Sequence, residues 1–141
     1  MNGGAADGGA EGGGIAAYDH VLLAAPPGAE EALRAFYGGL LGMAEEPKPP
    51  VLAARGGCWF RAAGGAVRLH LGVEEGFAPP RKAHPAFRVV GIDAVAARLV
   101  AAGVPVRWDD DLPGHRRFHT EDPVGNRLEV LEPVAPCPAT P

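Results

Sequence analysis

The chain carries the same series of structural signals twice, and this repeat limits the folds that it can adopt. An apolar run at 18–25 precedes an amphipathic helix pattern and three segments typical of strands. An apolar run at 83–89 precedes a second helix pattern and three more such segments. Aligning the two halves places RLHL (68–71) on RLEV (127–130). An internal duplication of a βαβββ unit is the simplest account, although its period is longer than that of solenoid repeats.

Both helix patterns have recognisable ends. Glu30 and Glu31 favour the positive end of the first helix dipole, and Gly42 is placed to stop that helix. Asp93 can cap the second helix, and Gly103 is placed to stop it. Each unit is therefore expected to contain one amphipathic helix packed on its strands.

The remaining segments of each unit have strand patterns. In the first half, 52–55, 57–62 and 66–72 are expected as strands, and the last two form a hairpin around a glycine pair. The proline-rich stretch 43–50 allows only a short or edge strand. The segments expected as strands in the second half are 104–108, 116–120 and 126–131.

The stretch 117–133 predicts a hairpin whose second arm carries a carboxylate. Asp122 and Asn126 bracket turn residues that include proline and glycine, and the Asp side chain can accept backbone N–H groups there. Because side chains alternate along a strand, Glu129 lies on the face opposite Leu128 and Val130. Glu129 is therefore either in solvent or directed into a polar cavity.

Composition divides the 141 residues into a domain and two flanking segments. Residues 1–16 are rich in Gly and Ala and are expected to be disordered. Residues 17–134 form a single domain, with module one at 17–75 and module two at 81–133. Residues 135–141 form a proline-rich tail.

Charge and cysteine usage exclude several classes of function. The net charge is −4, and no basic cluster follows an aromatic rhythm, so a nucleic-acid partner is not expected. No apolar run is long enough for a membrane span, and no signal peptide is evident, so a cytoplasmic location is expected. Cys58 and Cys137 form no metal-type pair and are expected to be free thiols. The excess of Ala, Gly, Pro and Arg is typical of a GC-rich bacterial genome.

The repeat also aligns four residues that can bind a metal ion. His20 matches His84, and His70 matches Glu129. Equivalent side chains of a duplicated unit can converge on its pseudo-twofold axis. Two or three imidazoles with one carboxylate suit a divalent Fe, Mn, Co, Ni or Zn ion.

Each of these residues has an ordinary structural alternative. His20 could be a core histidine bonded to a carbonyl, His84 could simply begin a strand before Pro85, and Glu129 could be solvated. Their joint occurrence at matching points of the repeat favours a metal set of His20, His84 and Glu129. His70 is then either a fourth ligand or a residue that lines the pocket.

The chain resembles the vicinal oxygen chelate (VOC) superfamily, which includes glyoxalase I, fosfomycin-resistance transferases, extradiol dioxygenases and bleomycin-resistance proteins. The resemblance covers nearly all of 18–133 and is carried by the segments YDHVLLAA, ALRAFYGGLLGM, KAHPAFRV, DAVAARLVAAGVPV and DPVGNRLEVLEP. It implies an α+β fold of two tandem βαβββ modules that form a cupped mixed β-sheet around one site. It also implies a homodimer.

Individual site residues follow from the resemblance. It implies metal ligands at His20, His84 and Glu129, while His70 lies where glyoxalase I has a glutamate that is both a ligand and an acid-base group. This difference removes half of the paired-glutamate chemistry and leaves His70 and Glu129 as the catalytic candidates. The residues expected to line the substrate pocket are Trp59, Arg61, Arg117 and His119, the last where relatives often have a tyrosine.

The implied function is a metal-dependent lyase, isomerase or small-molecule-modifying transferase. Such an enzyme chelates neighbouring oxygens of its substrate on a divalent metal ion. The alternative is a non-catalytic binding protein of the bleomycin-resistance type, which sequesters its ligand and needs no metal. Retention of the ligand set favours the enzyme.

Overall fold

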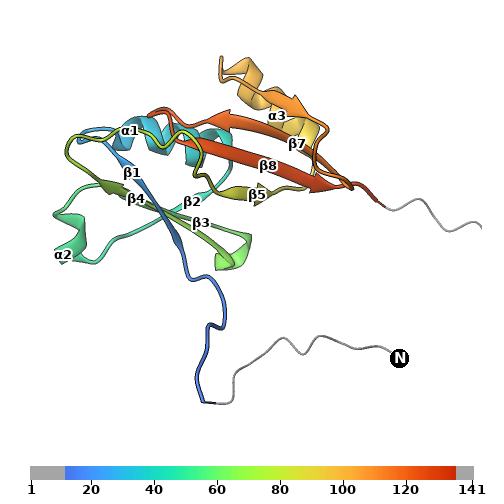
Figure 1. The fold of residues 1–141 in the computed structure, drawn as a ribbon. Coiled ribbons are helices and arrows are strands. Elements are labelled where there is room, and N and C mark those ends of the chain that lie inside the picture. Colours follow the sequence, from blue (N-terminus) through green and yellow to red (C-terminus); the bar gives the residue numbers. More distant parts are fainter. Residues whose placement is uncertain (1–11, 136–141) are drawn as a thin grey trace, which may run out of the picture.

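The structure is a computed structural model, which describes residues 12–135 (Figure 1). The strands of this part of the chain form two four-stranded sheets, and the predicted α+β fold with two tandem βαβββ modules is confirmed. The segments 1–11 and 136–141 lie outside the described residues. The predicted disorder of 1–16, the predicted tail and the domain boundaries therefore stay predictions.

Module one has one sheet and one principal helix. Its elements are β1 (Val21–Ala25), α1 (Glu30–Leu33), the π-helical continuation η1 (Arg34–Leu40), β2 (Ala44–Glu46), α2 (Pro50–Ala53), β3 (Cys58–Ala62), the 3-10 turn η2 (Ala63–Gly65) and β4 (Val67–Val73). The strand order is β1-β4-β3-β2, in which β1 runs parallel to β4 and the other neighbours are antiparallel.

Module two repeats this topology. Its elements are β5 (Ala86–Arg88), α3 (Ile92–Ala101), β6 (Arg107–Asp109), β7 (His115–Glu121) and β8 (Arg127–Pro133). The strand order is β5-β8-β7-β6, again with a parallel pair between the first and last strands of the module. Each module thus contributes its own sheet, and no strand pairing joins the two sheets within residues 12–135.

One hydrophobic core lies between the modules and includes Tyr37 of η1, Phe60 of β3, Leu99 of α3 and Phe118 of β7. Helix α3 contacts both η1 and β8. Alternate residues of each sheet enter this core, so the residues between them point to the opposite face. We call that opposite side the polar face of each sheet.

The hairpin turn of module two also forms hydrogen bonds with module one. As predicted, Asp122 Oδ1 accepts the backbone N–H groups of Val124 (3.0 Å) and Asn126 (2.9 Å). The amide Nδ2 of Asn126 donates to the carbonyl of Ala24 in β1 at 2.8 Å. The hydroxyl of Tyr37 donates to Asp122 Oδ2 at 2.7 Å. Module one therefore provides two partners for a turn of module two.

Two local predictions were wrong. Residues 52–55 were expected as a strand, but Pro50–Ala53 form α2, because proline has the backbone angle of a first helical residue. Asp93 was expected to cap α3, but the N-cap is Gly91, whose N–H donates to the carboxylate of Glu132 at 2.6 Å. Asp93 instead pairs with Arg116 at 2.6 Å.

The helices of residues 12–135 are all too short or too polar to cross a membrane. Cys58 is buried and free, as predicted, and burial raises the pKa of its thiol to about 11. A thiol with this pKa is protonated at neutral pH and is a poor nucleophile. Cys137 lies outside the described residues.

Candidate functional site

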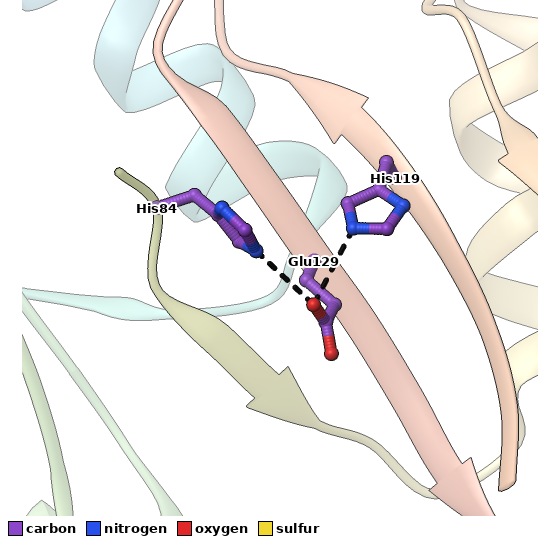
Figure 2. Close-up of side chains that lie close together, drawn as sticks. All are labelled: His84, His119 and Glu129. Atoms are coloured by element: carbon purple, nitrogen blue, oxygen red, sulfur yellow. Dashed lines mark hydrogen bonds and ion pairs between the residues drawn. The ribbon is translucent and has the colours of Figure 1, made fainter. Parts of the chain in front are cut away.

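Three side chains converge on the polar face of module two (Figure 2). Nε2 of His84 lies 3.1 Å from Oε1 of Glu129, and Nε2 of His119 lies 3.3 Å from the same oxygen. The ligand atoms of the three residues all lie within 4.8 Å of one another. His84 precedes β5, and His119 on β7 pairs directly with Glu129 on β8. We call these three residues the His2Glu group.

The second nitrogen of each histidine in this group lies near an oxygen atom. Nδ1 of His84 donates to the backbone carbonyl of Lys82 at 2.6 Å. Nδ1 of His119 lies 3.3 Å from Oδ2 of Asp109. The hydrogen bond to the Lys82 carbonyl favours the proton on Nδ1 of His84 and leaves the lone pair of its Nε2 directed toward Glu129, whereas His119 has a carboxylate oxygen 3.3 Å from each ring nitrogen. Outer acceptors of this kind orient the histidine ligands of metal sites.

The chemistry of the His2Glu group fits a divalent cation. With the proton of His84 on Nδ1, its Nε2 and the Glu129 oxygen face each other as acceptors, and Nε2 of His119 lies beside the same oxygen. A cation placed among them, whether a proton or a metal ion, relieves their repulsion. Two histidines and a carboxylate suit the borderline divalent metals and leave coordination positions open for a substrate.

The pKa shifts agree with an ionised carboxylate and a neutral imidazole. Burial alone would raise the pKa of Glu129, but the contact with His84 and the charge of Arg117 lower it overall. Burial lowers the pKa of His119, and the charge of Arg127 lowers it further. At neutral pH both side chains are therefore in the protonation state that metal coordination requires.

Arg117 is held beside the group by two carboxylates. Its Nε donates to Asp109 Oδ1 at 2.8 Å, and its Nη1 lies 3.5 Å from Glu129 Oε1. The hydrogen bond from Arg117 lowers the pKa of Asp109, which therefore stays charged next to His119. The predicted contact of Arg117 with a substrate stays a prediction, and the structure gives this arginine a positioning role.

The other two predicted histidine ligands lie on module one. The His70 ring stacks between His20 and Trp59, with ring centroids 4.0 Å apart on both sides and interplanar angles of 18° and 4°. Within one chain, His20 and His70 do not join the His2Glu group. Their roles as metal ligands, and the catalytic role of His70, stay predictions.

The two predicted pocket residues of β3 differ in their surroundings. Trp59 is half-buried and lines a cavity of about 510 Å³ on the polar face of module one. Arg61 is exposed and lies outside the lining of that cavity, with its Nη1 4.0 Å from Glu46 Oε1.

His119 is the member of the group that the sequence did not indicate as a ligand. It was expected only to line the substrate pocket. The predicted hairpin could have indicated this role, because a hairpin centred on Val124 pairs His119 with Glu129. Residues directly opposite each other on antiparallel strands have neighbouring side chains.

Comparisons with known proteins agree with this architecture. Residues 21–131 match the family model described as a glyoxalase-like domain. A glyoxalase family protein from Bacillus anthracis is 47% identical, with a TM-score of 0.82 over 86% of this chain and 98% of that chain.

Two more distant structures share the fold. The antibiotic-binding protein TnmS3 from Streptomyces sp. CB03234 is 25% identical, with a TM-score of 0.64 over 86% of this chain and 100% of that one. A lactoylglutathione lyase from Agrobacterium tumefaciens is 22% identical, with a TM-score of 0.64 over 84% and 94%. No functionally curated protein matches the chain. The match over residues 21–131 and the 47% identical relative establish that the chain belongs to the glyoxalase-like domain family of the VOC superfamily.

Proposed function

We propose that the protein is a metal-dependent enzyme that acts on a small molecule, with His84, His119 and Glu129 as its metal ligands. The supporting observation is that two imidazole Nε2 atoms and one carboxylate oxygen converge while Nδ1 of His84 donates to the Lys82 carbonyl and Nδ1 of His119 lies beside Asp109. A divalent ion bound there would supply Lewis-acid polarisation of two neighbouring substrate oxygens. The reaction class is lyase, isomerase or small-molecule-modifying transferase.

The chain's own residues orient the ligands and place charge beside the substrate. The Lys82 carbonyl accepts from Nδ1 of His84 and orients its ring, and the carboxylate of Asp109 lies 3.3 Å from Nδ1 of His119. Arg117 holds Asp109 and places a positive charge next to Glu129. A fixed positive charge at this point stabilises negative charge that develops on a substrate oxygen. We also propose that the protein is a homodimer from a bacterial cytoplasm.

The second candidate function is sequestration of a ligand without turnover. A cavity of about 880 Å³ lies between β1 and β5, and its lining includes Leu22, Leu23, Val67, Phe77 and Phe87. A largely apolar cavity of this size can hold a drug-sized molecule. TnmS3, which has the same fold, is an antibiotic-binding protein.

Metal affinity distinguishes the two candidates. The experiment compares untagged wild-type protein with His84→Ala, His119→Ala and Glu129→Gln by calorimetric titration with Zn(II), Ni(II), Mn(II), Co(II) and Fe(II). His115→Ala is the matched control, because His115 also lies on β7 but its Nδ1 donates to the carbonyl of Pro113.

We expect about one ion per wild-type chain and an affinity lower by about tenfold or more in each ligand variant. The control variant should bind metal like wild type. A wild-type protein that binds none of these ions would contradict the enzyme and favour ligand sequestration.

A further inference from the structure

We propose that Arg127 makes the site selective for anionic substrates, because it binds a carboxylate on the molecule whose neighbouring oxygens face the His2Glu group. This inference rests on the proposed function and names the substrate class of that same site, which is a small organic acid. Arg127 is two residues before Glu129 on β8, so both side chains lie on the polar face of module two. Positions two apart on an extended strand are about 6.5–7 Å from each other, so one small molecule can span them.

Arg127 is a neighbour of the His2Glu group in the register of the hairpin. Its partner on β7 is Glu121, which is two residues from His119. The charge of Arg127 acts on this ring, because it lowers the pKa of His119. Nη1 of Arg127 donates to the carbonyl of Arg81 at 3.4 Å, in the segment that leads to His84. The guanidinium therefore reaches from β8 toward the segment that carries a proposed metal ligand.

Arg127 has no carboxylate partner, unlike two other arginines of the same face. Arg107 on β6 pairs with Glu121 at 2.8 Å, and Nε of Arg117 donates to Asp109. Within residues 12–135, Arg127 makes no ion pair, and its Nε is buried without a hydrogen-bond partner. A guanidinium binds a carboxylate through two parallel N–H groups, and a donor without an acceptor is destabilising. A carboxylate of the substrate would supply the partner that this guanidinium lacks.

The charges around the His2Glu group also favour an anion. The carboxylates of Asp109 and Glu129 are both in contact with Arg117. Arg127 adds a second positive charge to this face, and that charge balances the second carboxylate. With a divalent ion bound, the face would carry an excess of positive charge. A substrate that has both negative chelating oxygens and a carboxylate would offset this excess, and a neutral substrate would not.

The test is calorimetric titration of Zn(II)-loaded protein with two hydroxamates that differ only at their remote end. Succinate monohydroxamate has a carboxylate there, and the monohydroxamate of succinamide has a neutral amide of similar shape. Both compounds present the same two neighbouring oxygens to a metal ion. The variants are Arg127→Gln, which removes the charge, and Arg127→Lys, which keeps it. Arg107→Gln is the matched control, because it removes a positive charge that already has a carboxylate partner on the same face.

We expect wild type to bind the carboxylate compound about tenfold or more tightly than the amide. Arg127→Gln should abolish this preference, while its affinity for the amide stays close to that of wild type. Arg127→Lys should retain part of the preference, and Arg107→Gln should retain all of it. Equal binding of the two compounds by wild type would overturn the proposal. An equal loss of affinity for both compounds in Arg127→Gln would also overturn it, because a purely structural arginine gives that result.

Two further titrations separate failure of this proposal from failure of the proposed function. Arg127→Gln should bind Zn(II) at least as tightly as wild type, because it removes a positive charge near the ligands, and a loss of metal would contradict a role in substrate binding. If wild type binds no metal ion, the proposed enzyme fails, and the same two compounds are titrated in EDTA. A preference for the carboxylate that requires Arg127 would then support anion recognition by itself, and equal binding would overturn it.

Discussion

His70 and Glu129 occupy the same place in their two modules. Each lies on the strand that runs parallel to the first strand of its module. Each also has an aromatic ring directly opposite on the neighbouring hairpin strand, which is Trp59 for His70 and His119 for Glu129. The same backbone framework therefore presents a ring stack in module one and the His2Glu group in module two.

Asp109 should control metal affinity through His119. Asn at position 109 keeps the shape but removes the charge that faces Nδ1 of His119, so the ring is held less firmly. Asp109→Asn is expected to weaken metal binding by about 10- to 100-fold, as loss of outer partners does in other sites. Calorimetric titration measures this change. Asp110→Asn, an exposed neighbour, is the control, and equal affinities of the two variants would contradict the role of Asp109.

The ring stack should make stability depend on pH. Burial and the charge of His20 lower the pKa of His70 below its ordinary value of 6.5, although Glu46 and Asp19 oppose the shift. As pH falls, the unfolded chain therefore takes up this proton before the folded chain does. The contribution of His70 to the free energy of unfolding is complete above pH 6.5 and is lost as pH falls through the folded pKa.

His70→Phe keeps a flat ring but cannot titrate. Between about pH 7.5 and about pH 5.5, the free energy of unfolding should fall more for wild type than for this variant. Urea denaturation at the two pH values measures the difference. An identical pH dependence of the two proteins would show that His70 is not protonated preferentially in the unfolded chain.

The contact between Tyr37 and Asp122 should stabilise the junction of the modules. Tyr37 is fully buried, and Tyr37→Phe removes only the hydroxyl that donates to Asp122 Oδ2. The buried carboxylate then has one donor fewer, so the free energy of unfolding should fall by about 1–3 kcal/mol. Tyr18→Phe is the matched control, because Tyr18 is 93% exposed. Comparable losses in both variants would contradict the role of the hydroxyl.

Gly57 should tolerate no side chain, in contrast to Gly39. Gly57→Ala combines a positive φ with overlap on the Leu71 carbonyl, and it is expected to destabilise the protein by about 1–3 kcal/mol or more. A Cβ on Gly39 meets open space within η1, so Gly39→Ala should be neutral or stabilising by up to about 1 kcal/mol. Chemical denaturation compares the two, and similar effects would be inconsistent with the close approach at Gly57.

Much of the fold could be predicted because its signals are local. Apolar alternation, helical spacing and the Asp122–Asn126 turn gave both modules and their strand order along the chain. The exception was 52–55, where the preceding prolines began a short helix in place of a strand. The alignment of His70 with Glu129 also holds in three dimensions, since equivalent strands pair in equivalent registers.

The candidate site was less predictable, because it depends on contacts between strands. His84 and Glu129 were expected to be neighbours, and Nε2 of His84 lies 3.1 Å from Oε1 of Glu129. His119 was predicted only to line the substrate pocket, because its position opposite Glu129 depends on the register of the hairpin and not on a sequence motif. Two carboxylates engage the guanidinium of Arg117, and its predicted contact with a substrate stays a prediction.

Local patterns in the sequence predicted the duplicated modules and the turn of module two. They also indicated His84 and Glu129 as candidate metal ligands. They did so because periodicity and turn chemistry depend on residues that are close in sequence. The packed structure decided which histidines are neighbours, joining His119 to the ligand group and leaving His20 stacked on His70. Which side chains become neighbours depends on strand register and on which face of each sheet packs into the shared core. Neither property can be predicted from a single segment of the sequence.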